Sequence, residues 1–138
     1  MRRLFVDTSA WDAIADAGDP NHEVARAFQE EIAGHRLLVA TDYVLDELYT
    51  LLLLNVGYER TLDVKSKLDI MIEKRVLEIV WVTEEITAEA WDVFVMYNTD
   101  KVWSFTDCVS YVVMKRRGIN EVFAFDADFR QMGFVCRP

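Results

Sequence analysis

Cysteine, proline and glycine are scarce in this chain of 138 residues, which has two cysteines, two prolines and five glycines. Cys108 and Cys136 have no CxxC partner and no regular spacing, so a disulfide framework is excluded and a reduced, cytoplasmic protein is expected. No repeat, low-complexity segment or linker interrupts the chain. Residues 1–138 are therefore expected to form one domain, for which a hydrophobic content of 52% is ample.

Basic charge and long apolar runs are also lacking. The chain has 24 acidic and 15 basic residues, a net charge of −9, which excludes a nucleic-acid binder of the generally basic kind. Any polyanion would need a local basic rim or metal ions. The longest apolar run, Leu51 to Leu54, falls far short of the ~20 residues that a membrane span needs. The apolar stretch near the N-terminus is too short for a signal peptide, so we expect no membrane association.

Strand-like and helix-like segments alternate along the whole chain. Strands are expected at Leu4–Val6, Leu37–Ala40, Leu77–Val82 and Val122–Phe125, with an edge strand at Phe134–Val135. Helices are expected between them, and the first begins at Thr8 or Ser9, where Ser9 and Asp12 have capping-box spacing. This order predicts an α/β fold, a three-layer α/β/α sandwich with a central, mainly parallel sheet. Trp81 and Trp91 are expected in its core.

Four acidic residues lie where an apolar segment gives way to a turn or a helix: Asp7, Glu47, Asp107 and Asp126. In open α/β sheets ligands bind beyond the carboxyl ends of the strands, so acids from distant segments are expected to converge there on one cleft. Each also has a structural explanation: Asp7 as a helix cap, Asp107 in a helix's first turn, and Asp126 in a solvated turn. Glu47 lies on a helix among apolar residues, where a carboxylate needs a partner, and the alternative is that Asp46 beside it is the solvated acid.

An all-oxygen ligand set without a histidine or cysteine cluster favours Mg²⁺ or Mn²⁺ over Zn²⁺. His22 and His35 both lie in the predicted helical pair or at its exit and give no general acid–base pair. Two carboxylates ~4 Å apart repel by about 4 kcal/mol at an effective dielectric near 20. A cluster of four therefore needs a cation, or one of the acids must stay protonated.

Four motifs occur in an order that resembles the PIN domain, and within it the VapC-type toxins of prokaryotic toxin–antitoxin pairs. They are Phe5-Val6-Asp7-Thr8-Ser9-Ala10, Asp46-Glu47-Leu48, Ser104-Phe105-Thr106-Asp107-Cys108 and Phe125-Asp126-Ala127-Asp128-Phe129. The resemblance covers essentially the whole chain.

By this resemblance the protein is a metal-dependent endoribonuclease that hydrolyses RNA phosphodiester bonds. The resemblance implies that Asp7, Glu47, Asp107 and Asp126 hold Mg²⁺ or Mn²⁺, with Ser9 as a supporting neighbour. It also implies a homodimer and an antitoxin that blocks the acidic cleft. Many relatives have Thr or Asn two residues before the fourth acid. This chain has Ala124 there, so Asp126 is expected to contribute least.

Two other classes of function remain open at this point. One is a non-catalytic PIN-like interaction module, in which the acids serve solubility or a structural ion. The other is a phosphoacceptor receiver domain, which predicts an acidic pair after the first strand and a lysine after the last. Asp7 stands alone after its strand and no lysine follows Phe125, so this class ranks low. For a nuclease, the basic residues that are candidates to frame the cleft and hold phosphates are Arg2, Arg3, Arg36, Lys101 and Arg130.

Overall fold

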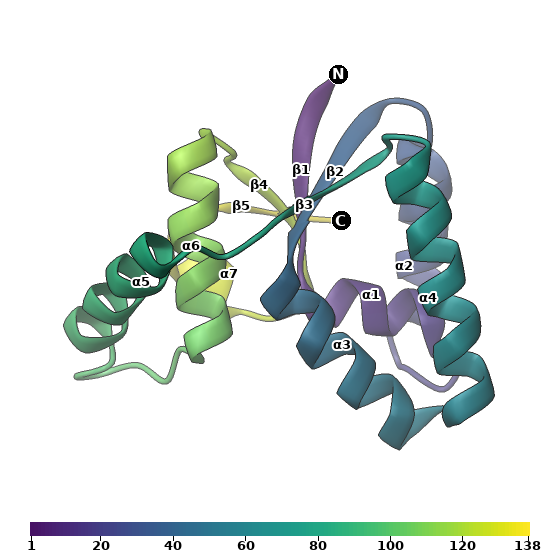
Figure 1. Ribbon diagram of the computed structural model, residues 1–138, viewed down its shortest axis with the longest axis horizontal. Helices are drawn as coiled ribbons and strands as arrows, with labels where there is room; N and C mark the ends of the chain where they lie inside the picture. The colour runs from purple at the N-terminus through teal and green to yellow at the C-terminus, as the bar shows by residue number, and fades with distance from the viewer.

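The computed structural model describes residues 1–138, and its centre is a parallel sheet of five strands in the order β3-β2-β1-β4-β5 (Figure 1). The strands are β1 (Arg2–Val6), β2 (Arg36–Thr41), β3 (Leu77–Val80), β4 (Glu121–Phe123) and β5 (Val135–Arg137). All four neighbouring pairs are parallel. The predicted sheet is confirmed.

Helices cover both faces of the sheet, α1 to α4 on one side and α5 to α7 on the other (Figure 1). They are α1 (Thr8–Ala15), α2 (His22–Ile32), α3 (Asp42–Asn55), α4 (Tyr58–Glu73), α5 (Glu84–Tyr97), α6 (Phe105–Arg117) and α7 (Asp128–Gln131). The α/β/α sandwich is thus confirmed. None of these helices combines the length and apolar character that crossing a bilayer requires.

Side-chain caps explain why the helices begin where they do. Thr41, Thr83 and Ser104 each accept a hydrogen bond from the backbone N–H three residues on, at the starts of α3, α5 and α6. The first helix corrects a prediction. Its cap is Asp7, which accepts from the Ser9 backbone N–H, and not the capping box of Ser9 and Asp12. The helix itself begins at Thr8, as predicted, and Asp7 acts as the helix cap that was its alternative structural explanation.

The order of the strands reverses at β1, because β2 and β3 lie on one side of it and β4 and β5 on the other. At this switch point the Asp7 backbone N–H donates to the Phe123 carbonyl (3.0 Å), which joins the carboxyl ends of β1 and β4. The first turn of helix α6 carries Asp107. The topology therefore directs residues 7, 107 and 126 to one end of the sheet.

The tryptophans divide differently from the prediction. Trp11 and Trp103 are buried in the core, whereas Trp81 is 71% exposed and Trp91 is 55% exposed, so the expectation for the latter two was wrong. Trp81 follows β3, which is an edge strand and lacks a neighbour that would cover it. Trp91 lies on the outer side of α5 and stacks on Phe94, with ring centroids 5.2 Å apart.

Candidate metal centre

The carboxyl ends of the central strands open into an acidic cleft of about 340 Å³. It is lined by all four acids selected from the sequence, together with Ser9, and by six further residues: Thr8, Asp12, Asp19, Asn21, Leu51 and Ser104. Leu51 is the only apolar residue of this lining, and no basic side chain contributes to it. Negative charge is therefore concentrated without any protein counter-charge.

Asp7 is held in the cleft by the residues that follow it. Its side chain is 3% exposed, and its Oδ2 accepts hydrogen bonds from the Ser9 hydroxyl (2.7 Å) and the Ser9 backbone N–H (3.2 Å). The Ser9 hydroxyl oxygen also accepts from the Phe125 backbone N–H (3.0 Å), which ties α1 to the segment after β4. The other carboxylate oxygen, Asp7 Oδ1, is buried and has no hydrogen-bond partner. An unpaired buried acceptor of this kind costs about 1–3 kcal/mol, and more when it is charged.

Burial raises the pKa of Asp7 from 3.8 to about 6, although the hydrogen bonds from Ser9 and Thr8 oppose the shift. Asp107 is 6% exposed. Its pKa is also raised, first by burial, then by the charge on Asp7 and by a side-chain hydrogen bond with Asp128. The two buried acids thus resist ionisation together. A cation bound by both carboxylates would offset both causes.

The segment after β4 brings a group of three carboxylates together. Oxygens of Asp107, Asp126 and Asp128 lie within 4.8 Å of one another, a spacing that allows shared coordination of one ion. Asp126 is exposed, and its Oδ1 accepts from the Asp128 backbone N–H (2.9 Å). Glu47 reaches the cleft from α3 and is half-buried, while its neighbour Asp46 is exposed.

Two acids of the site were missed as candidates. Asp128 belongs to the three-carboxylate group, and the Asp126-Ala127-Asp128 spacing was the signal that pointed to it. Asp12 lines the cleft from α1 between buried Trp11 and Ala13, and its Oδ1 is buried without a hydrogen-bond partner. Burial and the charges of Asp19 and Asp16 raise its pKa. The sequence signal for Asp12 was its position between two apolar residues, Trp11 and Ala13.

The arginines correct another expectation. Arg2, Arg3 and Arg36 do not frame the acidic cleft but line a separate groove at the opposite, amino-terminal end of the strands. Arg2 and Arg3 begin β1 and Arg36 begins β2, whereas Asp7 follows the last residue of β1. In a parallel sheet the starts of the strands lie at the edge opposite their ends, which separates these arginines from the acids.

A five-stranded parallel sheet with an acidic cleft at its switch point is the arrangement expected of the PIN class of α/β proteins. Residues 4–135 match the PIN domain, and the chain belongs to this family. It is 32% identical over 136 residues to the 23S rRNA-specific endonuclease VapC20 of two Mycobacterium tuberculosis strains, covering 98% of each chain. The predicted family is thereby confirmed.

Solved structures agree with this assignment. The crystal structure of Mycobacterium tuberculosis VapC20, described as a sarcin-ricin loop cleaving toxin, has a TM-score of 0.83 at 31% identity over 96% of both chains. VapBC2 from Rickettsia felis, bound to a DNA fragment from its promoter, has a TM-score of 0.67 at 14% identity over 98% of this chain and 97% of that one. FitAcB from Neisseria gonorrhoeae has a TM-score of 0.67 at 15% identity, over 98% of this chain and 96% of that one. The latter two share the fold.

Proposed function

We propose that the protein is a metal-dependent endoribonuclease and the toxin of a VapBC-type toxin–antitoxin pair. Membership of the PIN family and the 32% identity with an rRNA endonuclease support this function. The observation that carries it is the buried, unpaired Oδ1 of Asp7 in a cleft that also holds buried Asp107. The fold uses buried charge here at a cost in stability, as expected of a ligand site.

The residues of the cleft fit Mg²⁺ or Mn²⁺. Both ions prefer oxygen ligands, and this cleft supplies carboxylates and hydroxyls with no histidine or cysteine. Asp7 and Asp107 are the proposed direct ligands, since each is buried and has a raised pKa that a cation would lower again. Glu47 and Asp126 complete the set directly or through water, and Ser9 orients Asp7.

The cleft also explains how an acidic protein would hold a phosphodiester. No side chain that lines it is cationic, so a bound divalent ion would supply the attraction for phosphate, lower the pKa of water and stabilise charge on the phosphoryl oxygens. The carboxylates would favour binding of the scissile phosphate at the cation, because they would repel it elsewhere in the cleft. A carboxylate that does not hold the ion would accept a proton from water.

The proposed substrate is a structured RNA, with ribosomal RNA as the first one to try, because the VapC20 relative is a 23S rRNA-specific endonuclease. The test is incubation of the purified protein with ribosomes and with isolated hairpin RNA, in Mn²⁺, in Mg²⁺ and in EDTA. Cleavage is expected only with a metal ion, and it is expected to disappear in Asp7→Asn but not in the control Asp46→Asn. Equal RNA stability with and without protein would favour the interaction module.

An antitoxin is the proposed inhibitory partner, and a groove between α1, α2 and α4 offers it an apolar surface. Trp11, Ile14, Leu68 and Met71 contribute to its lining. An amphipathic antitoxin segment seated there would run beside α1, whose first turn carries the site, and a basic side chain of that segment would enter the acidic cleft. Met71→Glu is expected to abolish inhibition by the cognate antitoxin while cleavage persists.

A matched control lies on the same helix. Ile70 is exposed and is not part of the groove lining, so Ile70→Glu should leave inhibition intact. Loss of inhibition in both variants, or in neither, would refute the groove as the binding site of the antitoxin.

A homodimer in the cytoplasm is the proposed working state. Large apolar side chains are exposed on the helices and after β3, including Leu54, Trp81, Trp91, Val95 and Met96. Exposed apolar surface of this kind marks interaction sites. Both cysteines are free thiols, in keeping with a reducing compartment.

A further inference from the structure

The amino-terminal ends of the strands form a second polar groove, of about 470 Å³, far from the acidic cleft. Four arginines line it, Arg2, Arg3, Arg36 and Arg117, and we call it the arginine groove. Only two of its nine lining residues are apolar. A protein with a net charge of −9 thus gathers cations at the end of the sheet that lies opposite its acids.

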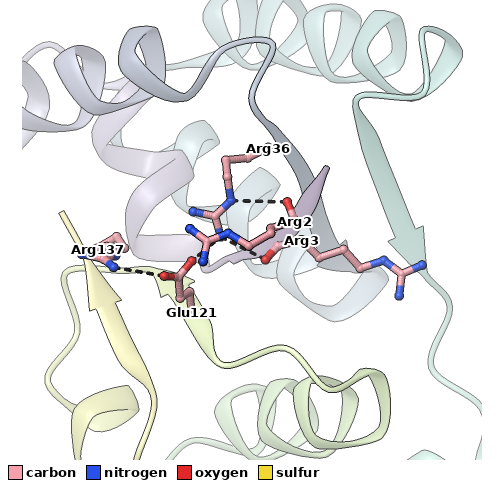
Figure 2. A network of polar contacts seen from close by, with 5 residues as sticks. All are labelled: Arg2, Arg3, Arg36, Glu121 and Arg137. Atoms are coloured by element: carbon pink, nitrogen blue, oxygen red, sulfur yellow. Dashed lines mark hydrogen bonds and ion pairs between the residues drawn. The ribbon is translucent and has the colours of Figure 1, made fainter.

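A buried ion pair holds the floor of the groove in place (Figure 2). Arg36 donates from Nε to the Arg2 carbonyl (3.3 Å) and from a terminal nitrogen to the Arg3 carbonyl (3.1 Å), and it pairs with Glu121. Arg137 donates to the other oxygen of Glu121 (3.0 Å). The side chains of Arg36 and Glu121 are only 11% and 14% exposed. These interactions join β1, β2, β4 and β5.

The arginines in and beside the arginine groove outnumber the carboxylates that pair with them. Glu121 is shared by Arg36 and Arg137, and Arg117 pairs with Glu78 (2.8 Å) at the rim. Arg2 and Arg3 form no ion pair, and both are exposed. Five guanidiniums therefore face two carboxylates, and three positive charges remain uncompensated.

The arrangement favours a polyanion over one small anion. Consecutive residues of a strand point to opposite faces, and the Arg3 side chain indeed extends away from Arg2 and Arg36 (Figure 2). The unpaired guanidiniums are thus spread along the strand ends and do not converge on one point. A planar guanidinium group can donate two parallel hydrogen bonds to the oxygens of one phosphate.

We propose that the arginine groove binds backbone phosphates of the RNA substrate at a distance from the cleavage site. This inference rests on the proposed ribonuclease function. Arg2 and Asp7 are five residues apart on one extended segment, about 16 Å at 3.3 Å per residue. Because β1 is a central strand and its carboxyl half is buried, an RNA that contacts both sites must pass around the sheet over a longer path than this. A structured RNA reaches both sites, and a tetranucleotide does not.

The test is binding of a fluorescent RNA hairpin to the full-length protein in EDTA, measured by anisotropy over a range of salt concentrations. For Arg2→Gln/Arg3→Gln we expect Kd at low salt to rise roughly tenfold and the slope of log Kd against log salt to fall by about 2, because each arginine neutralises about one phosphate. The control Arg26→Gln/Lys74→Gln changes net charge equally, at exposed positions outside the groove, and should shift Kd less than twofold.

Each other outcome overturns the proposal. Equal weakening by both pairs would mean that net charge alone matters. Unchanged RNA affinity, combined with a loss of thermal stabilisation by inorganic phosphate, would make the groove a small-anion site. If the double variant melts well below the wild type, Arg3→Gln alone replaces it, because that side chain points away from the buried ion pair.

Cleavage separates this proposal from the ribonuclease function itself. Cleavage of a tetranucleotide should be unchanged in the double variant, while KM for the hairpin rises and kcat is retained. A wild-type protein that binds the hairpin through the groove but never cleaves RNA would refute the ribonuclease and leave the groove standing. Normal hairpin KM in the variant would refute the groove alone.

Discussion

Replacing Asp7 by asparagine should stabilise the metal-free protein at neutral pH, although Asp7 is a proposed ligand. Its folded-state pKa of about 6 exceeds the 3.8 expected in the unfolded chain. A group with a raised folded pKa contributes stability below its unfolded pKa and loses it as pH rises through the folded pKa. At about 1.4 kcal/mol per pH unit, ionised Asp7 costs the fold about 3 kcal/mol above pH 7.

Asparagine keeps an acceptor for the Ser9 hydroxyl and backbone N–H and has no charge to desolvate. Urea unfolding in EDTA should show Asp7→Asn more stable than the wild type by up to about 3 kcal/mol at pH 7.5, which is about 10 °C in Tm for a domain of this size. Below about pH 3 the difference should nearly vanish, because Asp7 is then protonated in both the folded and the unfolded protein.

Divalent ions should largely cancel this difference. A ligand at a hundred times its Kd stabilises the folded state by about 2.7 kcal/mol, so Mn²⁺ should raise the unfolding free energy of the wild type and leave that of Asp7→Asn nearly unchanged. The exposed Asp46→Asn serves as the control and should behave as wild type in both buffers. A gain for Asp7→Asn that is independent of pH, or an equal response to Mn²⁺ in both proteins, would refute the reasoning.

Three further outcomes follow from the same cleft and the exposed apolar surface. Asp107→Asn should remove nearly all cleavage with the fold intact, whereas Asp126→Asn should cost less, because Asp126 is exposed; equal losses in a time course of RNA cleavage would contradict this order. Ser9→Ala removes the hydroxyl between Asp7 and the Phe125 backbone N–H and should lower the unfolding free energy by about 1 kcal/mol. An unchanged unfolding free energy in urea titrations would contradict this prediction. Sedimentation should show a dimer at tens of micromolar, and a monomer there would remove the dimer proposal.

Local signals were sufficient for the fold and for most of the cleft. Apolar segments of strand length separated by capped helices determine a parallel sheet, and strand ends of such a sheet must share one edge. Asp7 and Asp107 could be placed at that edge because each follows a strand or opens a helix. The reach of Glu47 from α3 was predictable only as an acid among apolar neighbours.

The predictions that were wrong or incomplete depended on the tertiary arrangement, which local sequence patterns do not contain. Whether a tryptophan is covered depends on which strand lies at the edge of the sheet and which helix face turns outward, as Trp81 and Trp91 show. The arginines that begin β1 are near Asp7 in sequence but are separated from it by the length of a strand. Asp128 belongs to the site because of the turn that follows β4. In this turn the Asp128 backbone N–H donates a hydrogen bond to the Asp126 side chain.

The chemistry of the cleaved ends tests the central claim most directly. Cation-assisted attack by water, as proposed for the cleft of Asp7 and Asp107, incorporates a water oxygen into the product phosphate. Cleavage in ¹⁸O-labelled water with Mn²⁺, followed by mass spectrometry, should therefore show one free hydroxyl end and one monophosphate end carrying ¹⁸O. A 2′,3′-cyclic phosphate end would show attack by the ribose hydroxyl, and cleavage that persists in EDTA would show a reaction without the metal ion; either result would contradict the account.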